Sequence, residues 1–117
     1  MSPASHPWPS PDEPEVFHLL GWAWDVRAAR ALVAGRPTIL VPVLDFADVA
    51  PYFPVEPSVV AAADLTRPLL VVPARNDRRL VIAGWDGIHH ALRADITELP
   101  AWLLTPAEEQ RIRLRGG

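Results

Sequence analysis

Three titratable side chains lie close together in the segment Gly-Trp-Asp-Gly-Ile-His-His, residues 84–90. Asp86 precedes His89 by three residues and His90 by four, and side chains at these spacings are neighbours on one face of a helix. A carboxylate can orient an imidazole that titrates near neutral pH, so these three are the candidate catalytic residues. Asp86 and His90 would also supply two metal ligands, but a third is not evident and no metal site is predicted. In a purely structural role, one histidine would be solvated and the other hydrogen-bonded in the core.

The segment lies where a predicted strand turns into a predicted helix. Residues 80–83 are apolar, as in a buried strand, and Ile88, Ala91 and Leu92 then recur at helical spacing. The first amides of a helix have no internal partners and point outward with the positive end of the helix dipole, so such a corner attracts anions. The candidate cofactor-binding residues at this corner are Gly84, Trp85 and Gly87.

Capping residues and apolar periodicity predict three further helices. The first begins after Asp25 and stops at Gly35, and the last begins at Thr105 with a capping box and ends the chain. The middle helix spans residues 58–64 and is capped by Ser58.

Apolar runs predict the strands that these helices cover. Residues 69–72 and 80–83 are joined by a polar turn, which indicates a hairpin, and residues 100–104 form another strand. Residues 38–43 read as a buried strand that ends near a proline. Residues 16–24 form the first ordered segment, and its two tryptophans lie on one face if the backbone is extended. We therefore expect an α+β fold: a single small domain with a mixed sheet and short helices.

Length and composition restrict the class of protein. A chain of 117 residues supports one hydrophobic core, and we assign residues 1–15 to a proline-rich flexible arm and residues 16–117 to the domain. The net charge of −3 makes a nucleic-acid partner unexpected. No apolar run reaches the length of a membrane span, no secretory signal is evident, and cysteine is absent, so we expect a cytoplasmic protein. Arginine without lysine, beside abundant alanine and proline, is typical of an actinobacterial-like, high-GC composition.

The connection from residue 44 to residue 68 alternates prolines with short apolar groups. Long irregular connections in small domains are often functional lids, so Asp45, Asp48, Tyr52 and Phe53 are candidates to cover a pocket. Packing as an ordinary surface loop explains them equally well.

Residues 69–72, 80–92 and 99–105 together resemble ParB/sulfiredoxin-like domains, in which a hairpin runs into an Asp-Gly-x-His-Arg type motif, an alanine-rich helix and a Leu-Pro strand. The resemblance covers roughly residues 38–113 and is strong from residue 69 onward. It implies a small domain that binds nucleotides, in which the motif's backbone amides and arginine hold phosphates. Members of the family cleave, hydrolyse or transfer phosphoryl groups.

The motif itself departs from the family pattern. If Gly84-Trp85 is aligned with the family's Gly-Trp, then Ala83 replaces the aspartate, Asp86 the histidine and Gly87 the arginine. A carboxylate that faces bound phosphate would repel it, and no guanidinium remains at the motif to compensate. Candidates for a displaced phosphate contact are Arg67, Arg75, Arg78, Arg79 and Arg93.

A second register is also available. It equates Asp86-Gly87 with the family's Asp-Gly and His89 with the histidine, and it leaves His90 in place of the arginine. We favour the first register, because a helix that starts near Trp85 then buries its apolar residues.

Three functions follow from this altered corner. The first is a pocket reused to bind or transform a small organic ligand in a biosynthetic pathway, through acid–base chemistry at Asp86 with either histidine and without a cofactor. The ligand-binding residues would then be Tyr52, Trp85 and Trp102. The second is a catalytically inactive interaction or regulatory module with a protein partner, or a homodimer. The third is an ATP- or CTP-dependent enzyme with displaced phosphate ligands.

Overall fold

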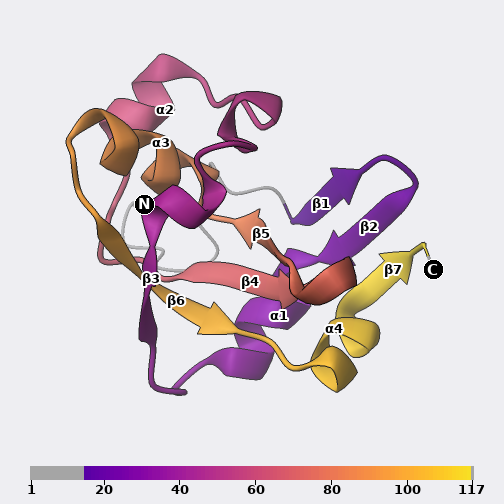
Figure 1. Cartoon of the computed structure of the whole chain (residues 1–117). Coiled ribbons are helices and arrows are strands. Elements are labelled where there is room, and N and C mark those ends of the chain that lie inside the picture. Colours follow the sequence, from indigo (N-terminus) through magenta and orange to yellow (C-terminus); the bar gives the residue numbers. More distant parts are fainter. Residues whose placement is uncertain (1–14, 117) are drawn as a thin grey trace, which may run out of the picture.

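A mixed four-stranded sheet lies at the centre of the computed structural model, which describes residues 15–116 (Figure 1). Its strand order is β3 (Ile39–Pro42), β6 (Glu98–Leu103), β4 (Leu69–Pro73) and β5 (Arg79–Ala83). β4 is parallel to β6, and the other neighbouring strands are antiparallel, so the expected mixed sheet and the β4–β5 hairpin are confirmed. The predicted arm at residues 1–15 lies outside the described residues except for Glu15.

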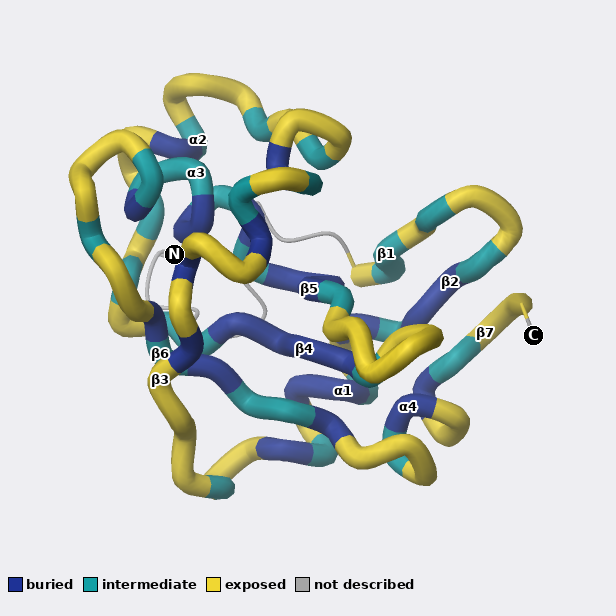
Figure 2. Tube along the Cα trace, in the orientation of Figure 1, coloured by how far each residue is buried: buried dark blue, intermediate teal, exposed yellow. Residues whose placement is uncertain are grey.

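The central strand β4 is buried on both faces and divides the hydrophobic core in two (Figure 2). Leu69 and Val71 point to the side that is covered by α3 (Trp85–Arg93) and by the connection that contains η2 (Val43–Phe46), η3 (Ala50–Tyr52) and α2 (Pro57–Ala61). Leu70 and Val72 point to the side that is covered by α1 (Val26–Val33) and α4 (Pro106–Ile112). A strand without polar residues needs this arrangement, because successive side chains alternate between the two faces.

A second, antiparallel sheet joins the two ends of the described chain. Its order is β1 (Val16–Leu19), β2 (Trp22–Asp25) and β7 (Arg113–Arg115). The first ordered segment, residues 16–24, is a hairpin of two strands that turns at Leu20, a residue with φ of +54°. The chain also does not end on the last helix, because β7 follows it and pairs with β2. Trp22 and Trp24 do share one face, with ring centroids 5.9 Å apart.

Local capping signals predicted two helices correctly. The Asp25 carboxylate accepts a hydrogen bond from the amide of Ala28 at 2.9 Å, and Gly35 has the expected left-handed φ of +83°. At the start of α4, the amide of Glu108 donates to the Thr105 hydroxyl and the Glu108 carboxylate accepts from the Thr105 amide, which is the complete capping box. Both caps depend on residues only three positions apart.

Two other elements differ from prediction. β3 is an edge strand that exposes Ile39 and Leu40, so it is not a buried strand. The helix expected at residues 58–64 is α2, which begins at Pro57 and ends at residue 61, so Ser58 lies inside it and does not cap it. With these corrections, the expected α+β fold is confirmed as a single domain across residues 15–116. Within that range, none of the helices combines the length and apolar character that a membrane span requires.

An ion pair connects Arg36, the residue after Gly35 at the end of α1, to Glu108 in α4. One guanidinium nitrogen donates to Oε1 of Glu108 at 3.0 Å and the other contacts Oε2. The Arg36 guanidinium, followed by the Thr105 amide, lowers the pKa of the Glu108 carboxyl from 4.5 to about 2. Arg113 similarly lowers the pKa of Glu109.

These shifts predict the pH dependence of stability. Because the folded-state pKa of Glu108 lies below the unfolded value, its contribution is complete above about pH 4.5 and is lost as the pH falls through about 2. The free energy of unfolding, measured with urea between pH 6 and pH 2.5, should fall toward acid, and the Glu108→Gln variant should show a shallower fall. An identical slope in the variant would contradict the assignment.

Candidate functional site

The corner between β5 and α3 requires glycine at position 84. Gly84 is the residue that caps α3 and has φ of +107°, a conformation that other residues rarely adopt. A Cβ there would lie 2.4 Å from Cδ2 of Leu69, so the corner also packs closely against β4. The helical phase expected after it is confirmed, since Ile88 and Ala91 are fully buried.

A cavity of about 430 Å³ lies beside this corner. Its wall is formed by Gly84, by the end of β5, by β1 and by the connection at residues 52–55. The aromatic residues of the wall are Phe17, Tyr52, Phe53 and Trp85, and its charged residues are Arg67 and Asp86. The structure therefore brings together three of the predicted corner residues, the predicted Tyr52 and an arginine that was a candidate for phosphate contact.

The aromatic wall is held by ring stacking and one hydrogen bond. Phe53 stacks on Trp85 with centroids 4.6 Å apart and an interplanar angle of 18°, and Phe17 lies 5.6 Å from Phe53. The indole nitrogen of Trp85 donates to the carbonyl of Val81 at 2.9 Å, which fixes the ring against β5. Tyr52 is exposed and lies at the rim. These contacts preorganise an apolar surface at the corner.

Two charged groups interrupt this apolar wall. Nε and Nη2 of Arg67 are buried, and Asp86 lies in the first turn of α3, where a carboxylate is stabilised by the helix dipole. Both residues also line a smaller cavity that is shared with Gly87 and Asp64. Hydrogen bonds from the hydroxyl and amide of Thr66 lower the pKa of Asp64, so this carboxyl is ionised near neutral pH.

The two histidines tie α3 to the long connection. His89 Nε2 lies 2.9 Å from the carbonyl oxygen of Phe53, and His90 Nδ1 lies 2.8 Å from that of Val60. A carbonyl only accepts, so each of these nitrogens carries a hydrogen. Neither histidine lines the cavity. Among the residues that the structure describes, no hydrogen bond joins Asp86 to either imidazole, so the structure does not form the pair expected for acid–base chemistry.

Trp102 lies away from the cavity. Its indole nitrogen donates to the carbonyl of Arg36 at 2.7 Å, and the side chain packs with the core beneath α1 and α4. Its neighbours Ala101 and Leu103 pack on the α3 side, so strand alternation places Trp102 on the opposite face of the sheet.

The connection contributes to the site only in part. Tyr52 and Phe53 line the cavity as predicted for a lid, whereas Asp45 and Asp48 lie in a separate depression beside the β4–β5 turn. Sequence reasoning missed Phe17, because no local pattern shows that β1 reaches the corner.

No protein-family model, curated protein or solved structure matches this chain in comparisons of sequence and of fold.

Proposed function

We propose that this protein binds a small organic ligand with a planar apolar group in the cavity at the β5–α3 corner. The observation that carries the proposal is the cavity of about 430 Å³ with four aromatic residues in its wall. Ligand sites are commonly apolar concave pockets of about 300–1,000 Å³ with a few polar groups that orient the ligand. The stacked Phe53 and Trp85 rings supply the apolar surface, and Arg67 and Asp86 supply the polar groups.

Binding is better supported than catalysis. Asp86 is in the wall, but neither imidazole expected to act with it lines the cavity, and each lies within hydrogen-bond distance of a backbone carbonyl, that of Phe53 or that of Val60. We therefore infer that Asp86 serves recognition, and that His89 and His90 hold the wall in place through Phe53 and α2.

A nucleotide-binding function is the second candidate, and its support is Arg67. If the chain is a divergent ParB/sulfiredoxin-like domain, Gly87 occupies the position of the family's phosphate-binding arginine. Because glycine has no side chain, Arg67 would make the phosphate contact in its place. Asp86 in the same wall opposes a multiply charged anion. Millimolar ATP or CTP with Mg²⁺ should raise the melting temperature if this candidate is correct. The absence of a shift would exclude it.

Indole, a planar and uncharged probe, tests the proposed function. In ¹H–¹⁵N NMR titrations with millimolar indole, we expect shifts at the indole N–H of Trp85 and at the amides of Phe53, Gly84 and Asp86. Tyr52→Ala should weaken binding about three- to tenfold, since an aromatic contact contributes about 0.5–1.5 kcal/mol.

The matched control is Leu44→Ala, which removes another exposed apolar side chain from the same connection, outside the cavity. It should leave the affinity unchanged. Indole shifts that are absent, or that spread over both cores, would refute the proposed function, as would equal losses in the two variants.

A further inference from the structure

We propose that the ligand of this cavity is an organic cation, in which a protonated amine is attached to the planar apolar group. The inference rests on the proposed function and names the charge that the site prefers. Its basis is one carboxylate, that of Asp86, in the same wall as four aromatic rings. Carboxylates and the faces of aromatic rings both attract positive charge, so the two kinds of group favour the same ligand.

The carboxylate of Asp86 is available to a ligand. The residue is partly exposed, follows Trp85 in the first turn of α3 and lines the cavity. Within residues 15–116, no hydrogen bond or ion pair engages its side chain. An ammonium group that enters the cavity can therefore form a charge-assisted hydrogen bond with Asp86 without displacing another partner.

The positive charge of Arg67, in the same wall, is already engaged. Arg67 takes part in an interaction of its own, and its Nε and Nη2 are buried. After the hydrogen bonds from Thr66, the charge of Arg67 also helps to lower the pKa of Asp64, which lines the smaller cavity together with Arg67. Because Arg67 acts on Asp64, Asp86 is the carboxylate of the wall that a cationic ligand would neutralise.

The position of Asp86 also disfavours an anionic ligand. The free amides and the positive dipole end at the start of a helix attract anions, but Asp86 lies in this first turn of α3 and supplies the negative charge itself. A carboxylate or phosphate in the cavity would meet that charge beside a mainly apolar wall, where it is screened less than in bulk water. The site should therefore bind a cation more tightly than a neutral ligand, and an anion least tightly.

The aromatic rings contribute to recognition of the same ligand. Phe53 and Trp85 are stacked, and the Val81 carbonyl holds the Trp85 indole in place, so a planar ring can pack beside them without reordering the wall. Asp86 directly follows Trp85, so an amine on a short linker can reach it from that ring. A cation within about 6 Å of an aromatic centroid gains a further electrostatic attraction.

Three probes that share one ring test the charge preference: tryptamine is a cation, indole is uncharged and indole-3-propionate is an anion. Calorimetric or NMR titrations at low ionic strength should give an affinity for tryptamine about five- to tenfold above that for indole, as expected for one partly exposed charge pair. Indole-3-propionate should bind more weakly than indole. Raising the salt concentration from about 20 mM to about 500 mM should reduce the advantage of tryptamine, because salt screens such a pair.

Two variants locate the preference. Asp86→Asn should reduce the affinity ratio of tryptamine to indole to about twofold or less, because the amide is similar in size but carries no charge. Asp48→Asn is the matched control, since it changes the net charge equally at a carboxylate in the separate depression, and it should keep the ratio of the unmodified protein. If Asp86→Asn does not fold, the salt titration of the unmodified protein decides, and a ratio that does not change with salt would overturn the inference.

The outcomes separate the two proposals. If neither indole nor tryptamine binds, the proposed function itself is refuted. If indole binds and tryptamine binds no more tightly, the cation inference is overturned and the proposed function stands. A preference for tryptamine that is the same in Asp86→Asn and Asp48→Asn would also overturn the inference, because Asp86 would then not be the group that recognises the amine.

Discussion

Replacing Glu109 with alanine is expected to lower the free energy of unfolding by about 2–4 kcal/mol, because it leaves two buried or half-buried partners without their acceptor. Glu109 is 5% exposed, and its carboxylate accepts a hydrogen bond from the indole N–H of Trp24 at 2.7 Å. It also accepts hydrogen bonds from Nε and Nη2 of Arg113, at 2.8 and 2.5 Å. The Arg113 guanidinium in turn lies 4.8 Å from the ring centroid of Trp22.

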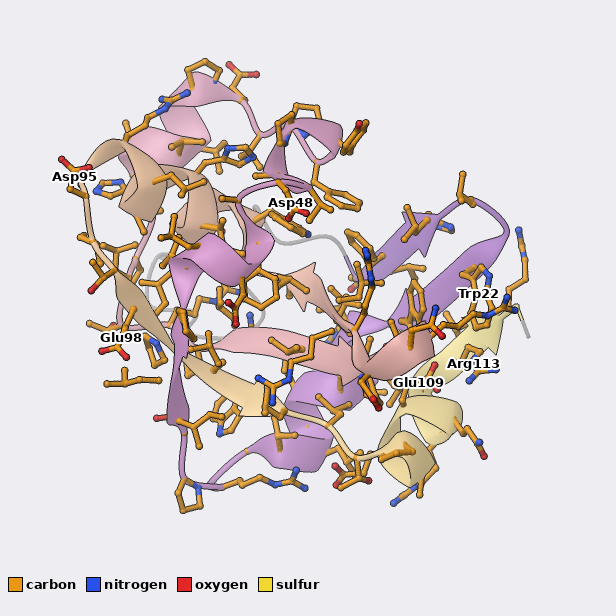
Figure 3. All side chains as sticks on the ribbon, viewed as in Figure 1. Trp22, Asp48, Asp95, Glu98, Glu109 and Arg113 are labelled. Carbon is orange, nitrogen blue, oxygen red and sulfur yellow. The ribbon has the colours of Figure 1, made fainter. Side chains whose placement is uncertain are left out.

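Trp22, Glu109 and Arg113 lie together where α4 meets the second sheet (Figure 3). With Trp24, which donates to Glu109, they form a cluster that joins α4 to this sheet. Because it connects β2 with β7, its loss should loosen the C-terminal strand as well as the core. The expected loss of stability is smaller than for a fully buried ion pair, since the Arg113 side chain is 24% exposed and can regain water.

Urea denaturation measures the loss of stability in Glu109→Ala, and two further variants serve for comparison. Glu109→Gln keeps an acceptor for Trp24 but loses the charge, so its cost should be intermediate. Glu98→Ala removes an exposed glutamate from β6 and should change stability by less than about 0.5 kcal/mol. A Glu109→Ala variant that is as stable as Glu98→Ala would show that the cluster contributes nothing.

Gly84→Ala should destabilise the protein by about 2–4 kcal/mol, because backbone strain and steric overlap act together. The φ of +107° is unfavourable for any residue with a Cβ, and that Cβ would meet Cδ2 of Leu69 at 2.4 Å. Leu69 is 2% exposed and its Cα lies 3.4 Å from the same position, so the side chain has little room to withdraw.

Gly21→Ala is the control, since no atom of the described residues lies within 4 Å of the position that its Cβ would occupy and its φ is not in the left-handed range. Thermal or urea unfolding should show only a small change for this variant. Equal stability of the two variants would mean that the corner can relax around a methyl group. If Gly84→Ala folds, indole binding should also weaken, because Gly84 lines the cavity and sets where α3 begins.

Much of the site was predictable because its signals are local. Gly84, Trp85 and Asp86 are consecutive, so the strand-to-helix corner alone places them at one end of the sheet. The buried phase of α3 and the caps at Asp25 and Thr105 likewise depend on residues within a few positions of each other.

The rest of the site depended on contacts between distant segments. Phe17 and Arg67 reach the cavity only because β1 and the turn before β4 fold toward the corner, and no periodicity encodes that approach. The histidines have helical spacing to Asp86, yet each imidazole has a carbonyl of the long connection within hydrogen-bond distance. Spacing shows which side chains share a helix face, but it does not show which partner lies opposite them.

The sequence by itself therefore determined an α+β domain with a strand, a glycine turn and a helix at residues 79–93, since hydrophobic period, capping and glycine conformation act over a few residues. Only the tertiary structure decided that β3 is an edge strand, that β7 closes a second sheet and that Trp102 faces away from the cavity. Strand order and register arise from pairing between residues far apart in the chain. The same long-range pairing places Arg67 and Asp86 in one wall.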